Sequence, residues 1–162
     1  MMNLVVNASP MILLGKVGRV DLLSKLCDSV FVPEGVVAEI SVDAEDTASR
    51  ALESCTWLKR VSVSIPDSIM AWDLGRGESE VISYALLQPG YRPLLDDAEG
   101  KACALAFGLK PLGTGGLLVL AKRAGLLHSV RIVLDDMRAK GLWLSDAVYK
   151  SILQIAGEET ER

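Results

Sequence analysis

The amino-acid sequence predicts an α/β fold in which a short, mostly parallel sheet is covered by helices on both faces. Two observations lead to this prediction. Short β-branched runs alternate with stretches whose apolar residues recur at helical spacing, as in parallel sheets with crossover helices. The 162 residues, half of them apolar, are also enough to enclose one hydrophobic core. We therefore expect a single domain, residues 1–157, followed by a frayed tail at residues 158–162.

The predicted strands are short, and turn or helix signals follow them. The first, residues 3–7 (NLVVN), ends at Asn7 because Ser9 and Pro10, a preferred N-cap and a preferred first helical residue, come next. The other predicted strands are residues 30–32, 61–65, 93–95 and 109–112. The predicted helices carry their apolar residues within 11–14, 20–27, 36–40, 44–55, 81–86, 102–109, 117–124, 129–140 and 145–156.

The composition argues against several classes of protein. The apolar stretch at residues 102–121 is interrupted by Lys110 and Pro111, so no run approaches the roughly 20 residues of a membrane span. No basic and apolar leader opens the sequence, and we expect a cytoplasmic protein. The cysteines are odd in number and widely spaced, which favours reduced core thiols over a disulfide framework or a zinc site: Cys27, Cys55 and Cys103.

The net charge of −4 is unevenly distributed along the chain. Residues 1–100 carry 8 basic and 15 acidic side chains, whereas residues 101–140 carry 7 basic and 2 acidic ones. An acidic pocket beside a basic flank would suit a cation together with a phosphate chain. The same pattern is also compatible with ordinary scatter over a solvated surface.

Two adjacent carboxylates follow the predicted strand at residues 93–95. Asp96 and Asp97 precede a helical pattern, and ligands of open α/β sheets bind beyond the carboxyl ends of the strands. The pair is therefore a candidate site. In the alternative interpretation, Asp96 forms a capping box with Glu99, and Asp97 is then less well explained as a cap.

Two glutamates elsewhere lie on the apolar faces of predicted helices. Glu39 shares a face with Val36, so it must be paired, bind a cation, or reach water at the edge of the stripe. Glu78 projects from the first turn of the inward face of its helix, where the helix dipole alone could also favour an acid. Glu80 is rotated about 200° away from Glu78, and we expect it to be solvated.

Other signals are weaker. The turn at residues 113–116 (GTGG) could cradle a phosphate, but it matches no established phosphate loop, and a tight turn capped by Thr114 is the preferred interpretation. His128 is the only histidine and has no adjacent acid, which disfavours a nucleophilic triad or zinc.

Oxygen ligands remain as the available chemistry. Glu39, Glu78, Asp97 and also Asp96 are hard ligands on three separate elements that a parallel sheet could gather at one edge, a set suited to Mg²⁺ or Mn²⁺. With such an ion, the expected chemistry is phosphodiester hydrolysis by activated water.

Four stretches together resemble the PIN-domain superfamily, and more closely its compact prokaryotic branch related to the toxin nucleases of toxin–antitoxin pairs. They are VVNASPMI, VPEGVVAEI, GRGESEVISYAL and LLDDAEGKACALAFGLKPLGTGGLL. The resemblance covers about residues 3–125. It implies a Rossmann-like three-layer α/β/α sandwich and a Mg²⁺- or Mn²⁺-dependent ribonuclease acting through a small set of acidic residues.

The resemblance also assigns roles to individual residues. Glu39, Glu78 and Asp97 fall on the second, third and fourth acidic positions of the family, and Ser9 on its small hydroxyl position near the metal. The first position departs from the family pattern, because Asn7 stands where an aspartate is usual. An amide oxygen still coordinates a hard cation, but it brings no charge, so metal affinity should fall. Asp96 is a candidate for supplying the missing charge.

The leading prediction is a ribonuclease that cuts single-stranded RNA, with a homodimer and an antitoxin partner expected from the resemblance. Substrate contacts are predicted at Ser9 and at Lys101, Thr114, Lys122 and Arg123. The second interpretation is a binding module of the same fold that has lost turnover, which Asn7 favours. A third is a nucleotide-binding or phospho-acceptor domain that uses Asp96 and Asp97.

Overall fold

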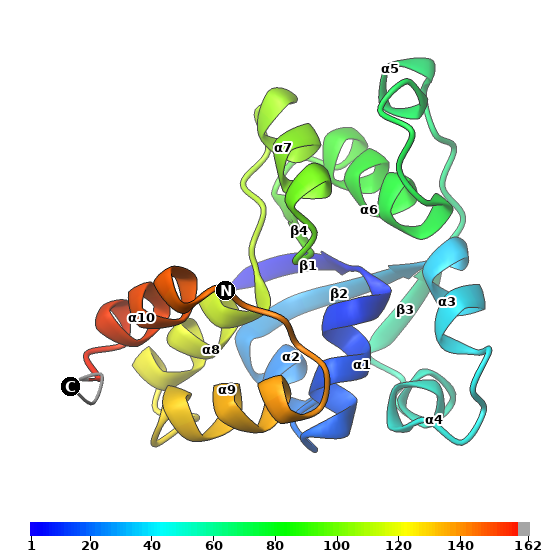
Figure 1. Ribbon diagram of the computed structural model, residues 1–162. Coiled ribbons are helices and arrows are strands. Elements are labelled where there is room, and N and C mark those ends of the chain that lie inside the picture. Colours follow the sequence, from blue (N-terminus) through cyan, green and yellow to red (C-terminus); the bar gives the residue numbers. More distant parts are fainter. Residues whose placement is uncertain (159–162) are drawn as a thin grey trace.

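The computed structural model describes residues 1–158 and shows a three-layer α/β/α sandwich around a parallel four-stranded sheet (Figure 1). The strand order is β3-β2-β1-β4. The strands are β1 (Met2–Val6), β2 (Cys27–Pro33), β3 (Leu58–Val61) and β4 (Tyr91–Leu94). This arrangement confirms the α/β class and the Rossmann-like architecture expected from the sequence.

Helices cover both faces of the sheet. In Figure 1, α6 and α7 lie above the sheet, whereas α1, α2, α8 and α9 lie below it. The helices are α1 (Ala8–Lys16), α2 (Asp21–Leu26), α3 (Glu34–Ile40), α4 (Thr47–Ser54), α5 (Asp67–Met70), α6 (Arg76–Leu87), α7 (Ala98–Ala106), α8 (Thr114–Arg123), α9 (Val130–Ala139) and α10 (Asp146–Ile155). Among residues 1–158, no helix combines the length and apolarity needed to cross a bilayer.

The central strand β1 explains why this sheet is buried on both sides. Leu4, Val5 and Val6 are all fully buried, although successive side chains point to opposite faces. β1 pairs with β2 on one side and with β4 on the other, both in parallel. The carboxyl ends of these strands therefore lie along one edge, and the residues that follow them share that edge.

Two predicted strands differ from the structure. β3 ends at Val61, where it pairs with Pro33, the last residue of β2, so residues 62–65 have no strand beside them in the sheet. The prediction of a strand at 61–65 was therefore wrong by most of its length. Residues 109–112 contribute a single bridge, Leu94 to Leu112, because the chain then turns into α8.

Glu80 is buried, not solvated as the helical rotation predicted, with only 3% of the residue exposed. It fits because Gly35 on α3 has no side chain: a Cβ there would lie 1.9 Å from Glu80 Oε2. The guanidinium of Arg76, one turn earlier on α6, lies 3.3 Å from the same oxygen. Packing of α3 against α6 thus buries the Glu80 carboxylate, which the helical pattern of the sequence had predicted to be solvated.

The C-terminal helix is fastened by Glu158, the first residue of the predicted tail. Its carboxylate accepts hydrogen bonds from the Ser129 hydroxyl and from the N–H groups of Val130 and Arg131 at the start of α9, and it pairs with Lys122 at 3.1 Å. Burial alone would raise the pKa of Glu158, but these hydrogen bonds lower it to about 2. Glu158 is therefore not frayed, and residues 159–162 lie outside the described part of the chain.

The cysteines match the prediction of unpaired thiols. Cys27 and Cys103 are buried and Cys55 is half-buried, and all three are free. Burial, together with the nearby Asp28 charge, raises the pKa of Cys27 to about 12, so this thiol is a packing group and not a nucleophile.

Candidate functional site

A cleft of about 510 Å³ opens at the carboxyl edge of the sheet. Its lining comes from the ends of β1 and β4, from α1 and α3, and from the loop between α9 and α10. The lining residues are Asn7, Ser9, Ile12, Leu13, Lys16, Glu39, Asp96, Asp97, Lys140, Gly141, Leu142 and Trp143. Five of the residues that the sequence nominated therefore share one cavity.

Asn7 reaches the cleft because of how α1 begins. Asn7 itself is the N-cap residue of α1, and its N–H donates to the Leu94 carbonyl at 3.0 Å, which continues the β1–β4 pairing. The prediction that Ser9 would be the cap was wrong: the helix starts at Ala8, and Ser9 is exposed in the cleft. Within residues 1–158 the Asn7 side chain makes no capping hydrogen bond, so its amide remains available to a ligand.

The two adjacent aspartates have roles opposite to the capping-box interpretation. Asp97 is the N-cap of α7 and accepts a hydrogen bond from the Gly100 N–H at 3.0 Å. Asp96 instead accepts from the Thr114 N–H at 2.8 Å and from the Thr114 hydroxyl. Asp96 therefore binds the start of α8, where the partial positive charge of the helix favours an anion.

The hydrogen bonds between Asp96 and Thr114 also determine the role of the glycine-rich turn at residues 113–116. Gly113, not Thr114, is the N-cap residue of α8, and Thr114 is completely buried with its hydroxyl committed to Asp96. The Asp96 carboxylate occupies the place at which a phosphate would meet this helix. The predictions of Thr114 as a cap and as a substrate contact are both corrected.

Glu78 is the most perturbed acid of the site. It stands in the first turn of α6 over Gly100, where an added Cβ would lie 1.9 Å from Glu78 Oε1. That oxygen is buried and has no hydrogen-bond partner among residues 1–158. Burial, followed by the charge of Asp97, a hydrogen bond with Asp97 and the charge of Glu39, raises the pKa of Glu78 to about 7. A carboxylate with one unpartnered oxygen beside two other acids calls for a proton or a cation.

Glu39 lies at the rim of the same region. The residue is exposed, so its carboxylate reaches water as one interpretation of the helical pattern proposed, yet it also lines the cleft. Its Oε2 atom lies 3.5 Å from the position that a Cβ on Gly77 would take. The absence of a side chain at Gly77 thus lets α3 bring Glu39 close to the start of α6.

Three elements therefore bring Glu39, Glu78 and Asp97 to one edge: Glu78 and Asp97 both adjoin Gly100, and Glu39 adjoins Gly77, the residue before Glu78. They are not yet packed together as ligands: within residues 1–158, no three side chains of histidine, cysteine, aspartate or glutamate form a group that could hold a metal ion. The edge is acidic and opens into the cleft, which Glu39, Asp96 and Asp97 line.

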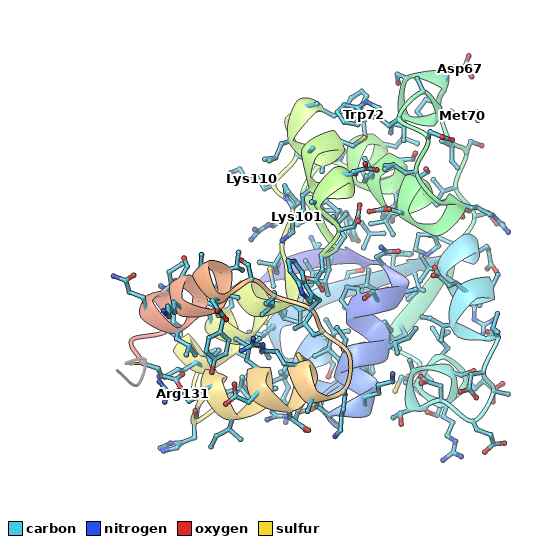
Figure 2. The ribbon with its side chains drawn as sticks, in the orientation of Figure 1. Asp67, Met70, Trp72, Lys101, Lys110 and Arg131 are labelled. Atoms are coloured by element: carbon cyan, nitrogen blue, oxygen red, sulfur yellow. The ribbon has the colours of Figure 1, made fainter. Side chains whose placement is uncertain are left out.

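The predicted basic contacts divide into two groups. Lys101 lies near the site, because a Cβ on Gly113 would be 2.8 Å from its Nζ atom and 3.3 Å from Asp96 Oδ1, and Figure 2 places Lys101 below α7. Lys122 and Arg123 lie in the last turn of α8, about 12 Å along the helix from Thr114. Lys122 is also paired with Glu158, so neither residue is placed to contact a phosphate in the cleft.

The sequence did not predict the wall of the cleft opposite the acids, which is formed by Lys16 and residues 140–143. Lys16 ends α1, and the segment from Lys140 to Trp143 joins α9 to α10. A Gly-Leu-Trp sequence after a helix marks a turn that exposes an aromatic residue, but no local pattern indicates that this turn faces the acids.

Comparison with protein families supports the fold. A family model described as a PIN domain matches residues 3–158. Comparisons with curated proteins and with solved structures gave no match. Because the matched region spans nearly the whole chain, this protein belongs to the PIN-domain family.

Proposed function

We propose that this protein is a divalent-metal-dependent ribonuclease that hydrolyses phosphodiester bonds of single-stranded RNA. The observation that carries the proposal is the buried, unpartnered Oε1 of Glu78 beside Asp97 and Glu39. Membership of the PIN-domain family supports a nuclease-type fold, and the proposal puts the site at the acidic edge.

The oxygen donors at this edge are of the kind that a hard cation prefers, and the carboxylates would have to draw together around the ion, because no three of them are grouped within residues 1–158. Glu78, Asp97 and Glu39 would hold Mg²⁺ or Mn²⁺ through carboxylate oxygens, and Asn7 would add an amide oxygen. When bound, such an ion supplies activation of water and stabilisation of the leaving oxygen.

The residues at the acidic edge have different parts in this proposal. The Asp97 carboxylate is oriented by the hydrogen bond that its Oδ2 atom accepts from the Gly100 N–H at the start of α7. Both oxygens of Asp96 accept hydrogen bonds from Thr114. Asp96 therefore stabilises the start of α8 and is less suited to replace the charge missing at Asn7. Lys16 brings positive charge to the opposite wall, where an RNA phosphate could lie, whereas the amine of Lys140 is paired with Asp136.

The test is cleavage of end-labelled, unstructured RNA with Mn²⁺, beside the variant Asp97→Asn. Asparagine is also a good helix cap, so the variant should fold while losing both cleavage and calorimetric Mn²⁺ binding. Asp46→Asn makes the same change at the cap of another helix, α4, outside the cleft, and should cleave normally. Equal cleavage by the Asp97→Asn and Asp46→Asn proteins would refute the assignment.

Asn7 favours a second candidate, a PIN domain that binds RNA or a protein without turnover, because it leaves the acidic set one charge short. Retained RNA affinity with no cleavage under any divalent metal would select this candidate. We also propose the homodimer and the antitoxin partner that the resemblance implies. Sedimentation of the purified protein tests whether it forms the homodimer.

A further inference from the structure

Trp143 is the largest apolar side chain on the wall of the cleft, and 82% of the residue is exposed. Tryptophan side chains are usually largely buried, so an indole presented to a cavity requires an explanation. Trp143 shares this cavity with Asn7, Asp96 and Asp97, the residues at the carboxyl edge of the sheet.

The loop that carries Trp143 is held in place. Gly141 takes a positive φ of 116°, and the Leu142 N–H donates to the Met137 carbonyl at 3.0 Å, which closes the end of α9. Leu142 is buried next to the exposed Trp143. Lys140 Nζ donates to the Lys16 carbonyl at 3.1 Å and so fastens the loop to the end of α1, beside which the orange segment of Figure 1 passes.

Lys16 supplies a positive charge to the cavity that Trp143 lines. Lys16 is exposed, lines the cleft and forms no ion pair within residues 1–158. An exposed aromatic ring beside a cation binds single-stranded nucleic acid, because every base has a face that can stack and every linkage carries a negative charge. A duplex would present its bases stacked on one another and leave the indole without a partner.

We propose that Trp143 is the stacking platform for an unpaired nucleobase of the RNA, next to the linkage that lies at the acidic edge. This inference deepens the proposed function and rests on it, since it names the subsite that selects single strands. A protein hot spot would need an apolar, desolvated surround. The cavity that Trp143 lines is mixed instead: beside Ile12, Leu13 and Leu142 it carries Asn7, Ser9, Lys16, Glu39 and two aspartates.

The test measures binding apart from cleavage, by fluorescence anisotropy in EDTA and again with Ca²⁺ in place of Mn²⁺. The probes are a short unstructured RNA, a strand of equal length that lacks bases, and a duplex. Trp143→Ala should weaken binding of the base-bearing strand about 10-fold and leave the baseless strand unchanged, whereas Trp143→Phe should retain most of the affinity.

Trp72→Ala is the matched control. Trp72 is also exposed, at 39%, but it does not line the cleft, and Figure 2 places it near α5 and the top of α7, away from the α9–α10 loop. A protein whose Trp57 and Trp72 are replaced by phenylalanine keeps Trp143 as its remaining tryptophan. The base-bearing strand should quench the fluorescence of Trp143, and the baseless strand should not.

Equal affinities of the Trp143→Ala and Trp72→Ala proteins for the base-bearing strand would overturn the inference, as would an equal loss for the baseless strand. Loss of self-association in the Trp143→Ala protein, with unchanged RNA affinity, would assign the indole to a protein contact and also overturn it. Trp143-dependent binding in a protein that never cleaves RNA would uphold the stacking site and reject only the ribonuclease.

Discussion

Gly100→Ala tests whether the position of the Glu78 carboxylate controls the chemistry of the acidic edge. The added methyl would lie 1.9 Å from Glu78 Oε1, whereas ordinary contacts to a Cβ begin near 3.4 Å, so the carboxylate must move by about 1.5 Å. A displacement of that size is large against metal–oxygen bonds of about 2.1 Å. Since misplacement of a reacting group by about 1 Å can cost 100-fold in rate, we expect Mn²⁺-dependent cleavage to fall by about 100-fold.

The fold should tolerate the same change. Alanine is favoured over glycine in a helix by up to about 1 kcal/mol, and the half-buried Glu78 can move toward the open cleft. Urea denaturation should therefore show a free energy of unfolding within about 1 kcal/mol of the original protein. The assay is single-turnover cleavage of labelled RNA, with Mn²⁺ affinity measured by calorimetry.

Gly115→Ala provides the control, because its methyl would lie 2.4 Å from Ile152 Cδ1 at the contact of α8 with α10, outside the cleft. We expect it to destabilise the fold by about 1–3 kcal/mol through overpacking while each folded molecule cleaves normally. The reasoning fails if Gly100→Ala cleaves RNA and binds Mn²⁺ as the original protein does, or if both variants lose the same fraction of activity.

Three further predictions follow from the carboxylates. The pKa of Glu158 is lowered from 4.5 to about 2, so the ionised carboxylate contributes about 3 kcal/mol to the free energy of unfolding. This contribution should be complete above pH 4.5 and should disappear as the pH falls toward 2. Urea denaturation of the Glu158→Gln protein should lack that part of the pH dependence. The pKa of Glu78 is raised from 4.5 to about 7, so in EDTA at pH 8 the charged group is destabilising by about 3 kcal/mol. Glu78→Gln should increase the free energy of unfolding by about that amount at pH 8 and have little effect at pH 4.5, and an effect independent of pH would contradict the raised pKa. Asn7→Asp adds a charge at the cleft and should raise calorimetric Mn²⁺ affinity about 10-fold, and unchanged affinity would remove Asn7 from the metal site.

The sequence by itself determined the features that depend on neighbours along the chain. The alternation of β-branched runs with helical spacing specified the parallel sheet, since burial on both faces requires apolar strands such as β1. The positions of Asn7 and Asp97 at strand ends followed from the helix starts after them, so their common edge was predictable. The family was also recognisable from four short stretches in order.

The tertiary structure alone decided the features that depend on residues brought together by folding. Asp96 accepts from Thr114 and leaves the cap of α7 to Asp97, and only the Leu94–Leu112 bridge brings those residues together. Glu80 is buried because Gly35 on another helix makes room for it. Lys140 reaches Lys16 across 124 positions and carries Trp143 to the cleft. Periodicity along one helix cannot specify such contacts, because it carries no information about which distant element packs against that helix.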